Sequence, residues 1–132
     1  MNNEIQNLQP KAVWGYFNEI LQIPRPSGKE EKVIAHLKAF AEKLKLEIKV
    51  DEVGNVLISK PATKGFENKP SLVLQSHMDM VCEKNSGTKH DFEKDPIKAE
   101  IENGWLIAKE TTLGADNGIG VAIQMAVLAA TD

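Results

Sequence analysis

The sequence contains a single cysteine, Cys82, in 132 residues. One cysteine excludes an internal disulfide and a cysteine-based zinc cage, which needs several thiolates. The chain also lacks any run of about 18 or more apolar residues, so the sequence predicts no transmembrane helix. Residues 1–10 are polar and have no apolar core of a secretory signal. These absences indicate a protein of a reducing, cytoplasmic setting.

Positive charge is not in excess either. The 16 Lys+Arg residues are outnumbered by 19 Asp+Glu, which gives a formal net charge of -3 and an isoelectric point of about 5.6. A nucleic-acid-binding domain normally carries a basic patch and a high isoelectric point. We therefore expect no nucleic-acid partner and no membrane partner. A composition of 42% apolar and 27% charged residues is typical of a globular domain.

Hydrophobic spacing predicts an α/β fold. Apolar residues at helical spacing predict a helix over 10–21 and a second one that ends near Lys45. The second helix follows Ser27 and Glu30, which have the spacing of an N-terminal capping box. Alternating residues predict a hairpin formed by strands 46–50 and 56–59, and the Asn-Gly pair within 101–107 predicts another.

Two apolar segments have no polar face. Leu72, Val73 and Leu74 are consecutive, which predicts an interior parallel strand over 72–75 that is covered on both faces. Residues 116–130 carry apolar side chains all around a helix, which predicts a helix buried on nearly every side. The expected architecture is a mixed sheet with helices packed on it.

The first candidate site is His77-Met78-Asp79, directly after the predicted interior strand. Ligand sites in α/β sheets lie beyond the carboxyl ends of strands. Residues two apart in extended backbone point the same way, so Asp79 can orient the imidazole of His77 as carboxylates do at zinc sites. The alternative is a histidine and an aspartate in a solvated loop.

The second candidate is Asp116, at the predicted start of the last helix. One role is an N-cap, which contributes about 1 kcal/mol. The other role is a metal ligand held rigidly by the helix start. Gly118 and Gly120 each cost about 1 kcal/mol relative to alanine inside a helix, so we expect a packing requirement that offsets this cost, with the helix lying close to the sheet.

Other residues have structural explanations. We expect His36 and His90 to be surface histidines and Cys82 to be a small buried filler. Trp14 and Trp105 are expected to be core or edge anchors. The sequence has no dinucleotide-binding glycine motif, no P-loop, no H-E-x-x-H and no G-x-S-x-G elbow.

The two candidate motifs together resemble those of a known family. Residues 72–81, followed by Gly114-Ala115-Asp116-Asn117-Gly118-Ile119-Gly120, are similar to the dizinc metallopeptidase family of dipeptidases, aminoacylases and tripeptidases. Segments 20–28, 51–56 and 90–97 look like its aminoacyl-histidine dipeptidase branch. The resemblance extends from about Leu8 to Asp132.

The resemblance implies a role for each candidate residue. His77 would be a terminal ligand of one zinc, Asp79 the catalytic residue that orients it, and Asp116 the bridge between two zinc ions. Manganese or cobalt can substitute for zinc. The implied reaction is hydrolysis of dipeptides, of the Xaa-His type or of broad specificity, by a metal-activated water and a glutamate base.

The family's base glutamate, its further ligands and its lid or dimerisation domain have no counterpart in residues 1–132. We therefore expect the N-terminal part of a catalytic domain, truncated at its C-terminus, which alone binds zinc weakly and hydrolyses nothing. A sheet edge left open by truncation is a pairing template, so a homo-oligomer is expected. The alternative function is a non-catalytic α/β binding or assembly domain.

Overall fold

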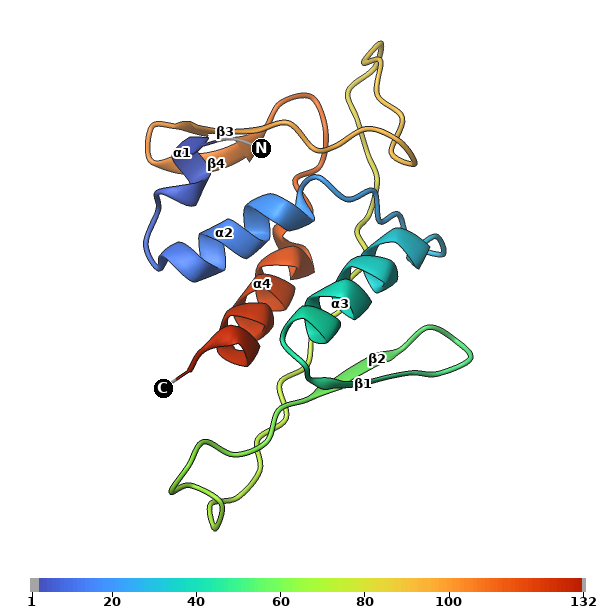
Figure 1. The fold of residues 1–132 in the computed structure, drawn as a ribbon. Helices are drawn as coiled ribbons and strands as arrows, with labels where there is room; N and C mark the ends of the chain where they lie inside the picture. Colours follow the sequence, from blue (N-terminus) through green and yellow to red (C-terminus); the bar gives the residue numbers. More distant parts are fainter. Residues whose placement is uncertain (1–2, 132) are drawn as a thin grey trace.

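The computed structural model describes residues 3–131, in which three helices are followed by two antiparallel hairpins and a last helix (Figure 1). The elements in chain order are α1 (Asn3–Gln6), α2 (Lys11–Ile20), α3 (Glu31–Lys43), β1 (Glu47–Val50), β2 (Val56–Ser59), β3 (Ala99–Glu102), β4 (Trp105–Ala108) and α4 (Ala115–Ala129). The predicted α/β class is confirmed, and the three longer helices lie between the two hairpins.

The core lies among the three longer helices. The helices α2 and α4 share the most extensive contact between any two elements. Phe17 and Ile20 of α2 and Met125 of α4 are each 1% exposed, and Leu37 and Phe40 of α3 join the same cluster. Each fully buried side chain of this size contributes about 1.5–3 kcal/mol, so this cluster stabilises the arrangement of the helices.

Both predicted hairpins are confirmed. β1 pairs with β2 and β3 with β4, each pair antiparallel. In β1 the half-buried residues Ile48 and Val50 alternate with exposed Glu47 and Lys49, as the sequence pattern predicts. The β3–β4 turn has positive φ angles of 51° at Asn103 and 80° at Gly104, the backbone that Asn-Gly pairs favour.

The predicted interior strand over 72–75 is not formed. Within residues 3–131 this segment pairs with no strand, and Leu72 and Val73 are 79% and 81% exposed. A parallel interior strand needs partner strands on both sides for its backbone groups, and the described part of the chain offers none here. The parallel part of the expected sheet is therefore missing.

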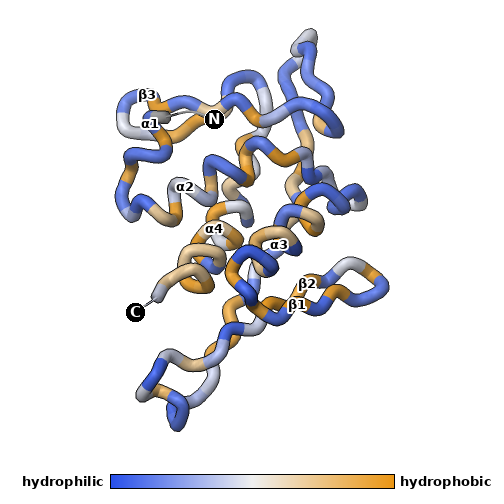
Figure 2. The backbone as a smooth tube through the Cα atoms, in the orientation of Figure 1, coloured by the Kyte–Doolittle hydropathy of each residue, from blue (hydrophilic) through white to orange (hydrophobic). Residues whose placement is uncertain are grey.

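The predicted all-round burial of α4 is wrong. Figure 2 shows mainly hydrophobic colours along this helix. Val121, Ala122 and Met125 are buried, whereas Ile123 and Val127 are 45% and 49% exposed. The reason is that α2 packs against one side of α4 and leaves the opposite side in solvent.

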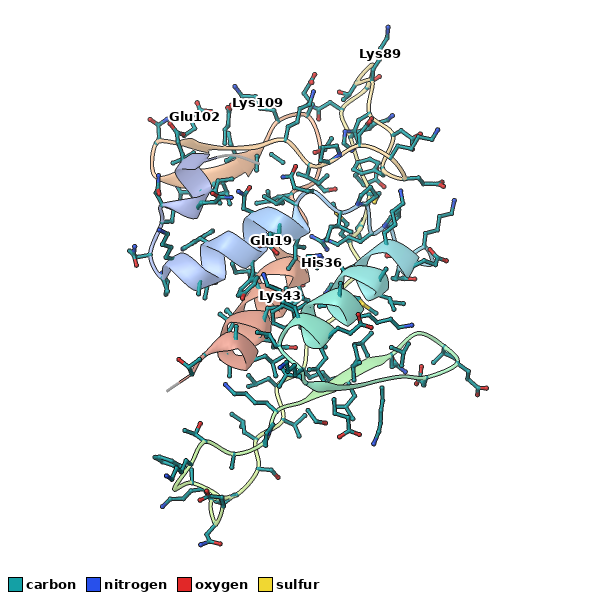
Figure 3. The ribbon with its side chains drawn as sticks, in the orientation of Figure 1. Glu19, His36, Lys43, Lys89, Glu102 and Lys109 are labelled. Atoms are coloured by element: carbon teal, nitrogen blue, oxygen red, sulfur yellow. The ribbon has the colours of Figure 1, made fainter. Side chains whose placement is uncertain are left out.

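The remaining histidines and tryptophans lie in different environments. His36 is half-buried, with Nε2 3.7 Å from the carboxylate of Glu19 (Figure 3), so it is not a fully solvated residue. Cys82 and His90 are also half-buried.

The two tryptophans differ in exposure. Trp14 packs edge-on against Phe17 and is an anchor as predicted, whereas Trp105, in the β3–β4 hairpin, is 74% exposed. No helix within residues 3–131 has the length and apolar character needed to cross a membrane.

Candidate metal centre

The segment that carries His77 and Asp79 is held by chain on both sides. On one side, Met80 N donates to Arg25 O at 3.0 Å and Ser27 N donates to Met80 O at 3.3 Å, which forms an isolated parallel bridge. On the other side, Thr112 N donates to Glu83 O at 2.8 Å. The backbone after residue 76 is thus fixed by pairing, although residues 72–75 are not.

The structure brings the three predicted site residues together. Nε2 of His77 lies 3.0 Å from Oδ1 of Asp116, and Nδ1 of His77 lies 3.1 Å from Oδ1 of Asp79. The imidazole therefore has one carboxylate at each ring nitrogen. These contacts raise the pKa of His77, chiefly through the hydrogen bond with Asp116, because both carboxylates favour the charged ring.

Asp79 is itself oriented by Ser27. The Ser27 hydroxyl donates to Oδ2 of Asp79 at 2.5 Å, which leaves Oδ1 for His77. This hydrogen bond is the main reason that the pKa of Asp79 is lowered, followed by the interaction with His77. The predicted capping box is therefore wrong. α3 begins at Glu31 without a side-chain cap, and the Ser27 hydroxyl donates to Asp79 instead of capping the helix.

Asp116 does not cap α4. Gly114 occupies the N-cap position with a φ of 73°, and no side chain caps the helix. Asp116 has non-helical backbone angles, and the peptide bond to Asn117 is cis. Its side chain is 96% exposed and reaches His77. Of the two roles considered from the sequence, the N-cap is excluded.

The close approach at Gly120 comes from a side chain of the same helix and not from a sheet. A Cβ atom at this position would lie 2.1 Å from Oδ1 of Asn117. The end of the Asn117 side chain would therefore have to move to admit a larger residue at position 120.

Sequence reasoning missed Arg25, which is 1% exposed and contacts the site from within the core. Its guanidinium donates to Met78 O and Asp79 O at 3.2 Å each and to Gly114 O at 2.7 Å. The signal in the sequence was that Arg25 is the single arginine among 16 Lys+Arg residues and lies between two prolines.

The donor chemistry fits a zinc ion. Imidazole nitrogen and carboxylate oxygen are preferred zinc ligands, and bonds of about 2.0–2.1 Å place two ligand atoms of a tetrahedral ion roughly 3.3 Å apart. The 3.0 Å between His77 Nε2 and Asp116 Oδ1 is close to that spacing. Both side chains line an open depression of about 480 Å³. Over residues 3–131, no set of three His, Cys, Asp or Glu side chains is placed to hold one ion together.

No family model matches the chain. The chain is 48% identical over 127 residues to cytosol non-specific dipeptidase from Escherichia coli. This alignment covers 96% of the chain and 26% of that relative. The crystal structure of aminoacylhistidine dipeptidase from Vibrio alginolyticus superimposes with a TM-score of 0.95 at 47% identity, over 99% of the chain and 27% of that protein. A tripeptidase from Staphylococcus aureus superimposes with a TM-score of 0.71 at 26% identity, over 92% of the chain and 32% of that protein.

The fold is thus that of part of a peptidase domain. Within that class, the chain is a homologue of cytosol non-specific dipeptidase, also called aminoacylhistidine dipeptidase. It spans about a quarter of the length of these two relatives. The predicted resemblance to dipeptidases and tripeptidases is confirmed.

Proposed function

We propose that the protein hydrolyses dipeptides at a zinc site to which His77 and Asp116 contribute ligands. The observation that carries this proposal is the 3.0 Å approach of His77 Nε2 to Asp116 Oδ1, with the other ring nitrogen held by Asp79. The 48% identity to a dipeptidase supports the substrate class. The word cytosol in that relative's name supports a cytoplasmic location.

Each residue has a distinct role in this proposal. His77 would be a terminal ligand, and Asp116, which has two oxygens on an exposed carboxylate, would hold both metal ions. Asp79 is a positioning residue that fixes the tautomer and the ring orientation of His77. The chemistry that bound zinc supplies is activation of water for attack on the peptide carbonyl, and manganese or cobalt can replace it.

The described residues do not provide a whole site. A catalytic zinc normally has three protein ligands, and His77 and Asp116 are two. We propose that further ligands and a general-base glutamate come from outside residues 3–131, as does a lid or dimerisation domain. Residues 1–132 alone are then one part of a peptidase domain that binds zinc weakly and turns over no dipeptide.

A dipeptidase assay on the full natural chain tests the proposal. Turnover of an Xaa-His dipeptide should depend on zinc, stop after chelation and return when zinc or manganese is added. His77→Ala should abolish turnover, whereas the control His36→Ala, on α3, should keep it. Turnover that survives His77→Ala or chelation would contradict the proposed site.

The second candidate is a non-catalytic binding or assembly domain. It is favoured by the exposed apolar side chains of Leu72, Val73, Ile123 and Val127, which a partner chain would cover. Light scattering together with dipeptide binding and turnover, measured with and without metal, distinguishes the two candidates. A stable homo-oligomer that binds dipeptides without metal and without hydrolysis supports the second candidate and contradicts the first.

A further inference from the structure

We propose that Arg25 is a positioning residue that sets the separation between His77 and Asp116. The inference rests on the proposed function, because it assumes that His77 and Asp116 bind zinc. The contacts of Arg25 are those observed within residues 3–131. Arg25 contacts neither ligand side chain, so any effect on the site acts through the backbone.

The guanidinium of Arg25 joins the two segments that carry the ligands. One terminal nitrogen donates to Met78 O and Asp79 O at 3.2 Å each, directly after His77. The other donates to Gly114 O at 2.7 Å, two residues before Asp116. These segments are far apart in sequence and are connected here through one planar group.

The residue type fits this task. Of 16 Lys+Arg residues, Arg25 alone is an arginine, and it is 1% exposed. Burial is the main cause that lowers the pKa of Arg25, and its Nε has no hydrogen-bond partner within the described residues. Placing a cation there is costly. The guanidinium offsets that cost because its two terminal nitrogens donate hydrogen bonds to three carbonyl oxygens. The single nitrogen of lysine cannot reach the same acceptors from two fixed positions.

Two glycines leave the space that the guanidinium fills. A Cβ at Gly114 would lie 2.6 Å from a terminal nitrogen of Arg25, and one at Gly118 would lie 2.8 Å from it. Gly118 lies within α4, where glycine costs about 1 kcal/mol relative to alanine. The approach of Arg25 is therefore a packing requirement that accounts for the glycine at position 118.

Two variants test the inference in the full natural chain. Arg25→Lys keeps the charge and removes the fork. Gly118→Ala keeps Arg25 but places a methyl group against its guanidinium. Each should weaken zinc binding by about tenfold to a hundredfold, as loss of outer-shell support does. Each should also shift the visible absorption spectrum of bound Co²⁺, because the angle between the two ligands changes.

Matched controls separate positioning from general stability. Lys60 donates to the carbonyls of Val127 and Ala130 at the other end of α4, so Lys60→Met removes a cation that holds the same helix away from the site. Gly15 lies in α2, and a Cβ atom added there would have no neighbouring group within 4 Å, so Gly15→Ala adds a methyl group to open space. Both controls should keep the zinc affinity and the Co²⁺ spectrum of the parent protein.

The outcomes are distinct. If Arg25→Lys and Gly118→Ala lower the melting temperature but keep the zinc affinity and the Co²⁺ spectrum, Arg25 only stabilises the fold and the inference is wrong. If the parent protein binds neither metal, the proposed function fails. The ¹⁵N NMR shifts of the His77 ring in metal-free protein then decide. Shifts that change in both variants support the role of Arg25, and unchanged shifts overturn it.

Discussion

Nε2 of His77 lies 3.0 Å from Oδ1 of Asp116, although the two residues are 39 positions apart in sequence. The contact joins the end of an extended segment to the first turn of α4, and it is exposed to solvent on the Asp116 side. Most buried apolar residues lie elsewhere, among α2, α3 and α4. His77 and Asp116 can therefore be changed with little effect on the core.

Asp116→Asn should weaken zinc binding without destabilising the fold. The substitution keeps the size of the side chain but removes the charge that favours a dication. We expect zinc affinity to fall at least about tenfold, since ligand carboxylates must be ionised. The melting temperature should stay within about 2 °C, as for most exposed substitutions. Competition with a chelator and a thermal scan measure the two effects, and unchanged affinity would remove Asp116 from the ligand set.

Ser27→Ala should weaken metal binding indirectly. Without the Ser27 hydroxyl, Asp79 loses the hydrogen bond that orients its carboxylate toward His77. We expect a loss of affinity of up to about tenfold, smaller than the roughly 10–100-fold loss for Asp79→Asn. Ser71→Ala, in an exposed loop, is the matched control. A larger loss for Ser27→Ala than for Asp79→Asn would show that Ser27 acts by another route.

Met125→Ala should destabilise the packing of α2 against α4. Met125 is 1% exposed, and removing most of its side chain leaves a cavity that costs about 2–5 kcal/mol. Ile123→Ala on the exposed side of the same helix should cost about 0.5 kcal/mol. Urea unfolding of both variants checks the difference. Similar losses for the two would mean that α4 is covered on both sides in solution.

Acid should weaken the β1–β2 turn through Asp51. Its carboxylate accepts from the Asn55 side chain and from the Asn55 and Val53 amides, and these bonds lower its pKa below the ordinary value of 3.8, the Asn55 side chain most. A lowered pKa in the folded state means that the stabilisation is present above pH 3.8 and is lost as pH falls through the folded pKa.

Asp51→Ala tests the direction of this pH dependence of stability. Unfolding by urea should show the variant to be less stable than the parent protein at about pH 6, with a difference that shrinks toward about pH 3. Glu52→Ala, exposed in the same turn, is the control and should show no such trend. A difference that grows on acidification would contradict the assignment.

The elements that sequence predicted correctly are those set by local patterns. The β1–β2 hairpin follows from strict alternation, and the β3–β4 turn follows from the positive φ angles that Asn103 and Gly104 tolerate. The helix over 10–21 is observed as α2, Lys11–Ile20. The proximity of His77 and Asp116 was implied by the family resemblance, which gives both residues as ligands in one site.

What sequence did not predict depends on distant groups. The apolar run at Leu72 predicts a strand, but a strand forms only where neighbouring strands complete its hydrogen bonds. Ser27 fits a capping box locally, yet its hydroxyl binds the carboxylate of Asp79, 52 residues away. The role of Arg25 depends on three acceptors in two later segments of the chain. No periodic pattern around Arg25 itself therefore predicts it.

The most direct test of the central claim is anomalous diffraction at the zinc edge from crystals of the full natural chain soaked in zinc. We expect an anomalous peak within about 2.0–2.2 Å of both His77 Nε2 and a carboxylate oxygen of Asp116. The peak should be lost in His77→Ala crystals. Zinc bound elsewhere in the molecule, with neither His77 nor Asp116 as a ligand, would contradict the claim.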